Sequence, residues 1–82
     1  MNAMEFWRDP ALTRSEGIAR AKFVCQQADC GYEYFKHICH GRKRPSAKMA
    51  LALEKASNGL MGFRDLLTAP LLSERNQENR AA

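Results

Sequence analysis

The sequence lacks any long run of apolar residues. Although 45% of its 82 residues are hydrophobic, no stretch approaches the roughly 20 apolar residues that a membrane-spanning helix needs. The first ten residues, MNAMEFWRDP, also lack the basic start and apolar core of a secretory signal peptide. We therefore expect a cytoplasmic protein without a membrane segment.

Cysteine and proline are both scarce, with three of each in the chain. The odd number of cysteines and the missing secretion signal favour reduced thiols over a disulfide framework. A chain of this length supports at most one small domain with a single core. We predict one domain over residues 1–72, followed by a polar and disordered tail over residues 73–82.

Acidic residues are missing from the middle of the chain. Between Tyr34 and Leu53 there is no aspartate or glutamate, while the same stretch contains Lys36, Arg42, Lys43, Arg44 and Lys48. The rest of the chain is nearly balanced, so the net charge of +4 is concentrated here. Such a concentration is typical of a nucleic-acid-binding surface, although a charged run is also compatible with an ordinary solvated face.

Apolar residues recur at helical spacing in most of the chain. The pattern predicts an all-α fold, a compact bundle of four to five short helices that contains a helix-turn-helix. Thr13 and Glu16 match a capping box, and Ser46 is a favourable N-cap. The expected helices cover residues 14–28, 31–40 and 47–57, with short helical turns at 4–7 and 63–67.

The residues around Asp29 match a helix-turn-helix. Such a motif needs a small residue where the two helices cross, a turn residue that tolerates positive φ, and apolar residues on the inner side of the second helix. Cys25 and Asp29 supply the first two, and Ala28, Cys30, Phe35 and Ile38 supply the apolar positions. Glycine is the usual turn residue, so Asp29 costs about 1 kcal/mol there.

This pattern makes residues 31–40 the predicted recognition helix. With Phe35 and Ile38 inward, the outward side chains are of types that contact base edges in the major groove. The predicted base-reading residues are Tyr32, Glu33, Lys36, His37 and His40. The predicted phosphate-binding residues follow the helix and include the N-cap of the next one: Arg42, Lys43, Arg44, Ser46 and Lys48.

Residues 25–67 resemble the lambda-repressor-like helix-turn-helix proteins of phages and prophages, in particular the small Cro-type and YdaS-like regulators. The resemblance rests on GRKRPS at 41–46, LEKASNG at 53–59 and the leucine pair of FRDLL at 63–67. It implies a sequence-specific transcriptional repressor that acts as a homodimer on a palindromic double-stranded DNA operator.

Two kinds of chemistry are weighed against DNA binding. Cys25, Cys30, His37, Cys39 and His40 lie close in sequence, but their spacing matches no common zinc site, so we expect no metal. A catalytic cysteine–histidine pair needs an activated thiol and a pocket, for which so short a bundle has little room. We therefore expect no enzymatic activity, no cofactor and no small-molecule substrate.

A protein partner is the main alternative to DNA. In this alternative the same scaffold is an antitoxin-like or phage-encoded protein-interaction module. The segment at residues 60–72 is also richer in leucine, methionine and phenylalanine than a small bundle can readily cover. We expect part of it to close the core and the remainder to form a two-fold dimer contact.

Overall fold

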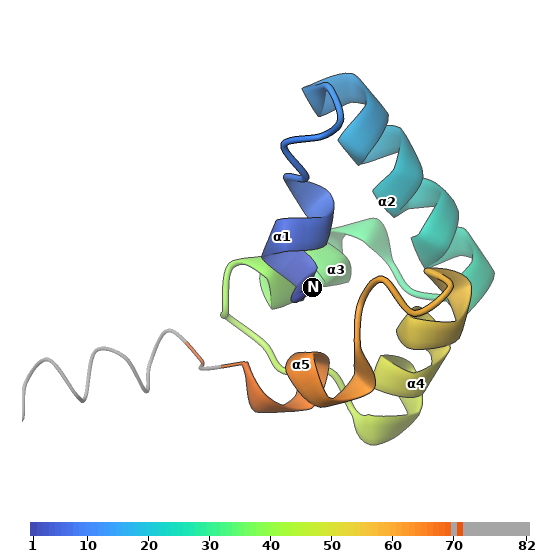
Figure 1. The fold of residues 1–82 in the computed structure, drawn as a ribbon. Helices are drawn as coiled ribbons and strands as arrows, with labels where there is room; N and C mark the ends of the chain where they lie inside the picture. The colour runs from blue at the N-terminus through green and yellow to red at the C-terminus, as the bar shows by residue number, and fades with distance from the viewer. Residues whose placement is uncertain (70, 72–82) are drawn as a thin grey trace, which may run out of the picture.

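The computed structural model describes residues 1–69 and 71 of the chain. This part contains five helices and no strand, which confirms the all-α prediction: α1 (Ala3–Trp7), α2 (Arg14–Ala28), α3 (Tyr32–Cys39), α4 (Ala47–Ala56) and α5 (Phe63–Thr68). In Figure 1, α1 lies beside α3, while α4 and α5 pack together below the end of α2. The tail predicted at residues 73–82 falls outside the described residues.

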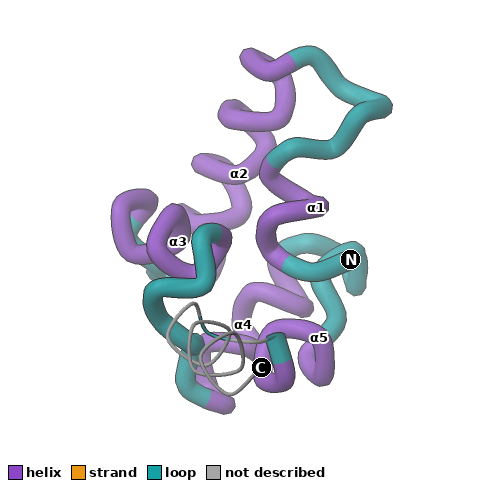
Figure 2. Tube along the Cα trace, turned by 90° about the vertical axis from the view of Figure 1, so that its left-hand side faces the viewer, coloured by secondary structure: helices purple, strands orange, loops and turns teal. Residues whose placement is uncertain are grey.

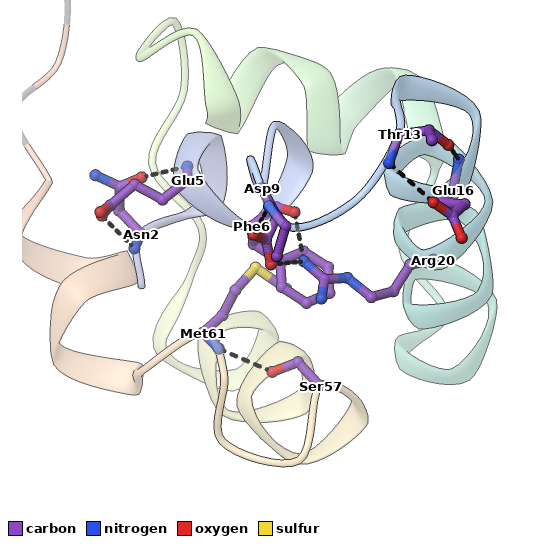
Figure 3. Close-up of polar contacts among 10 residues, drawn as sticks. Asn2, Glu5, Phe6, Asp9, Thr13, Glu16, Arg20, Ser57 and Met61 are labelled. Atoms are coloured by element: carbon purple, nitrogen blue, oxygen red, sulfur yellow. Dashed lines mark hydrogen bonds and ion pairs between the residues drawn. The ribbon is translucent and has the colours of Figure 1, made fainter.

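Side-chain caps mark the starts of α1, α2 and α4. The Thr13 hydroxyl accepts from the Glu16 backbone N–H at 3.2 Å, and the Glu16 carboxylate accepts from the Thr13 N–H at 2.9 Å. Asn2 and Glu5 form the same reciprocal box at the start of α1 (Figure 3). The hydrogen bonds to Thr13 lower the pKa of Glu16, because they favour its ionised form.

Left-handed residues follow α2 and α3 and redirect the chain. Asp29 has φ 56° and ψ 44°, and the Cys30 N–H donates to the Cys25 carbonyl at 2.8 Å, so α2 stops and α3 begins three residues later. Gly41 follows α3 with φ 73°. Both left-handed positions were expected from the sequence.

The core draws on every helix. Its largest fully buried side chains are Phe6, Phe35, Leu53, Met61 and Leu66. From the apolar segment after α4, Met61 and Leu66 close this core, and Phe63 and Leu67 pack against it. Leu60 stays exposed. The Glu54 carboxylate accepts from the Phe63 N–H at 2.8 Å, which positions the start of α5.

Arg20 links the first segment to α2. Its Nη2 donates to the Phe6 carbonyl at 2.7 Å and to Asp9 Oδ2 at 3.2 Å (Figure 3). The guanidinium carbon also lies 4.0 Å from the centre of the Phe6 ring. This contact holds α1 and the turn after it against α2.

None of the described helices is long and apolar enough to cross a lipid bilayer.

At Gly17 the backbone of α2 lies close to the end of α1. A Cβ at this position would lie 2.7 Å from the Trp7 carbonyl oxygen. Alanine normally stabilises a helix interior by about 0.5–1 kcal/mol relative to glycine, but here the added methyl group pushes the two helices apart. We predict that Gly17→Ala lowers the free energy of unfolding by about 1–3 kcal/mol, measured by urea denaturation.

Gly31→Ser is the matched control for that substitution. Gly31 is the N-cap of α3, and its added Cβ would meet only the Tyr34 Cβ at 3.9 Å, an ordinary contact. A serine cap should raise the stability by a few tenths of a kcal/mol. If the free energy of unfolding of Gly17→Ala equalled or exceeded that of the unsubstituted protein, the tight contact with Trp7 would be disproved.

Candidate nucleic-acid interface

The inner side of α3 packs on α1 and α2. Phe35, Ile38 and Cys39 are buried, with Phe35 fully excluded from solvent. The predicted inward positions Phe35 and Ile38 are therefore confirmed. Figure 2 views α3 nearly along its axis, with α1 to one side of it and the side away from α1 uncovered by the other described helices.

Glu33 and His37 lie toward the open side of α3, and Lys36 lies between this side and the flank occupied by Tyr32. The Glu33 side chain is 80% exposed, while Lys36 and His37 are half-buried. Lys36 Nζ lies 2.9 Å from Glu33 Oε1. Because an exposed ion pair of this kind stabilises a helix only weakly, both groups can exchange this contact for one with a ligand.

Tyr32 and His40 differ from the sequence prediction, which placed both on the outward side. Both are half-buried against Trp7: the indole Nε1 donates to the Tyr32 hydroxyl at 3.0 Å, and the His40 ring meets the Trp7 ring edge-on at 5.5 Å between centroids. The reason is that α1 covers this flank of α3. Local patterns in the sequence do not show where α1 docks.

The basic residues after α3 are held in a defined direction. The Arg42 N–H donates to the His37 carbonyl at 2.9 Å and the Gly41 N–H donates to the Ile38 carbonyl at 3.1 Å, which is the Schellman closure of a helix. Arg42 and Lys43 are exposed, and Lys43 Nζ lies 5.7 Å from the centre of the Tyr34 ring.

The remaining predicted phosphate-binding residues lead into α4. Arg44 is exposed, and its Nη2 donates to the Ala69 carbonyl at 3.2 Å, so it also holds the end of α5. The Ser46 hydroxyl caps α4 by accepting from the Met49 N–H at 3.1 Å. Lys48 is exposed in the first turn of α4. All five predicted residues are exposed, and they lie on the connection after α3 and in the first turn of α4.

Three further cations near α3 were missed in the sequence. Arg8 and Arg14 place their guanidinium carbons 5.1 Å and 5.4 Å from the Trp7 ring centre, and Lys22 Nζ lies 5.2 Å from the Tyr32 ring centre. These residues come from segments of nearly balanced charge. No compositional signal marks them, because only the packing of α1 on α3 brings them together.

The three cysteines are buried in the core. Burial raises the pKa of Cys39 to about 12. A hydrogen bond between the Cys25 and Cys30 thiols raises the pKa of Cys25 and lowers that of Cys30. In the part of the chain that the structure describes, histidine, cysteine and acidic side chains form no group of three or more that could hold a metal ion.

Comparisons of this chain with protein-family models, curated proteins and solved structures find no match.

Thiol chemistry tests the placement of the cysteines. At pH 8 we predict slow alkylation by iodoacetamide in the folded protein, because burial blocks access and a raised pKa leaves little reactive thiolate at Cys39. Cys30 should react before Cys39, and all three should react quickly in urea. Peptide mass spectrometry over time gives the order, and rapid labelling of native Cys39 would contradict the buried thiol.

Proposed function

We propose that this protein is a sequence-specific DNA-binding transcriptional regulator that inserts α3 into the major groove. The observation that carries the proposal is the geometry of α3. It follows a left-handed turn at Asp29, leaves Glu33 exposed, and ends in a closure that directs Arg42 and Lys43 outward. A helix about 10–12 Å across fits a groove about 12 Å wide.

Base recognition is assigned to the open side of α3. In this proposal the Lys36 ammonium donates to guanine acceptors, the Glu33 carboxylate accepts from a cytosine amine, and His37 contacts a neighbouring base. In the free protein these two side chains contact each other at 2.9 Å, and in the complex each exchanges this contact for one with a base. Tyr32 and His40, which pack on Trp7, take a secondary part at the edge of this surface.

Affinity is assigned largely to the stretch from Arg42 to Lys48. Its exposed cations lie where the chain leaves the groove, and the capped start of α4 offers backbone N–H groups to a phosphate. About four to six phosphate contacts predict a slope of log affinity against log salt of roughly −4 to −5 for each protein copy.

We further propose that two copies bind a palindromic operator as a homodimer and act as a repressor, as the resemblance implies. Two half-sites about one helical turn apart require a two-fold protein. Leu51 and Leu60 are exposed apolar side chains that could contribute to such a contact. Sedimentation equilibrium measures the oligomeric state of the protein and so tests the proposed homodimer.

A protein-interaction module is the second candidate function, and Phe23 favours it. This α2 residue has 60% of its surface exposed, although it is a large apolar side chain. An interaction that depends on Phe23 and is indifferent to salt would support a protein target instead of DNA.

Phosphate contacts should weaken binding to every DNA sequence alike. We predict that the double variant Arg42→Gln/Lys43→Gln binds all duplexes less tightly and lowers the salt slope by about 2. Duplexes selected from a random pool, with fluorescence anisotropy at several salt concentrations, provide the measurement. If the unsubstituted protein showed no salt-dependent binding to any duplex, the proposed function would be wrong.

Base contacts should change preference rather than general affinity. We predict that Lys36→Ala and Glu33→Gln each cost about 1–3 kcal/mol on the selected sequence and much less on random DNA. Repeating the selection with each variant should relax one base position. Equal losses on selected and random duplexes would remove these two residues from base recognition.

A further inference from the structure

Four cations surround a pair of hydrogen-bonded aromatic rings on the flank of α3 that faces α1. We call this the Trp7–Tyr32 cluster, and it consists of Trp7, Tyr32, Arg8, Arg14, Lys22 and Lys36. The two arginines lie over the indole at 5.1 Å and 5.4 Å, and the two lysines lie over the phenol ring at 5.2 Å and 5.3 Å. The cluster draws on α1, the connection to α2, α2 itself and α3.

The cluster carries an excess of positive charge. Asp9 is engaged by Arg20 at 3.2 Å and by the Ala11 N–H at 2.9 Å, and Glu33 pairs with Lys36. Among the described residues, therefore, Arg8, Arg14 and Lys22 form no ion pair with an acidic side chain. These three exposed cations are therefore available to contact an anionic ligand.

The surface beside Trp7 is hollowed. Arg8 and Arg14 line this open hollow together with Trp7, Pro10 and Ile18. A guanidinium that stacks on a ring keeps its N–H donors in the plane of the stack, where they remain available to an oxyanion. Two guanidinium groups therefore line one hollow, which also includes Asp9, whose carboxylate pairs with Arg20.

The position of the cluster relative to α3 suggests which phosphate it meets. Tyr32, Lys36 and His40 follow one another at four-residue spacing and so share one flank of the helix, toward Trp7. Tyr34, with Lys43 over its ring, lies roughly 160° away around the helix from Lys36. Cations thus lie on both flanks of α3, and a helix in the major groove has a DNA strand on each side.

We propose that Arg8, Arg14 and Lys22 of the Trp7–Tyr32 cluster bind the phosphate backbone of the strand opposite the one contacted by Arg42 and Lys43. The inference rests on the proposed DNA-binding function and extends it, because it makes α1 and the start of α2 part of the interface. It also gives Trp7 two roles, as a core residue and as the platform for the two arginines.

The test compares three double variants of equal charge. Arg14→Gln/Lys22→Gln removes cations of the cluster, Arg42→Gln/Lys43→Gln removes those of the other flank, and Lys55→Gln/Arg64→Gln is the control on exposed residues of α4 and α5. We expect the first pair to weaken binding about 10- to 50-fold at 0.15 M salt, without changing base preference, and to lower the salt slope by about 2. The control also removes two positive charges, so it should show only the small, general loss of affinity that follows from a lower net charge.

Tryptophan fluorescence provides a second readout. Trp7 is the only tryptophan in the chain, so its emission reports directly on the cluster. DNA should change this emission in the unsubstituted protein, and the change should be reduced in Arg14→Gln/Lys22→Gln. Circular dichroism checks the fold, and Lys22→Arg, which keeps the charge, should retain most of the affinity that Lys22→Gln loses.

The outcomes separate this inference from the function on which it rests. If the Arg42/Lys43 pair reduced binding while the Arg14/Lys22 pair behaved like the control, the cluster would play no part and only this inference would fail. If the unsubstituted protein showed no salt-dependent binding to any duplex, the proposed function itself would fail. If salt-dependent binding were present but neither pair altered it, both phosphate assignments would be wrong. If the Arg14/Lys22 pair changed base preference as well as affinity, the cluster would be a base contact, and the assignment to phosphate would be overturned.

Discussion

The packing of Trp7 between α2 and α3 is the contact on which the rest of the structure depends. On one side its backbone carbonyl lies where only glycine fits, at Gly17, and on the other its indole N–H donates to Tyr32. Arg20 holds the same segment through the carbonyl of Phe6. A helix of five residues has little stability of its own, so these tertiary contacts are what keep α1 in place, and α1 in turn supports one flank of α3.

That arrangement also decides the electrostatics of the surface. The cations after α3 follow it directly in the chain, and their direction is set by the closure at Gly41. Those of the Trp7–Tyr32 cluster reach α3 only through the packing of α1 and α2. On both flanks of α3, lysine side chains lie over tyrosine rings. These contacts limit the conformational freedom of the lysine side chains. Less entropy is then lost when they contact a phosphate.

Much of the fold could be predicted because local rules govern it. The capping box at Thr13 and Glu16 sets the start of α2, and Asp29 accepts the left-handed conformation that ends it. The inward positions Phe35 and Ile38 follow from helical spacing, and both are buried. The candidate site was only partly predictable. Glu33 lies on the open side as expected, whereas Tyr32 and His40 pack against Trp7, because burial depends on which other helix covers a given flank.

By itself the sequence determined the helices, their turns and the basic stretch that follows α3, since caps, periodicity and charge act between residues close in the chain. Only the tertiary structure decided which side chains of α3 stay open and which cations join them. Arg8, Arg14 and Lys22 are separated in sequence from Tyr32 by ten or more residues, and no local preference connects them. They meet because burial of Phe6 and Trp7 brings α1 against α2 and α3.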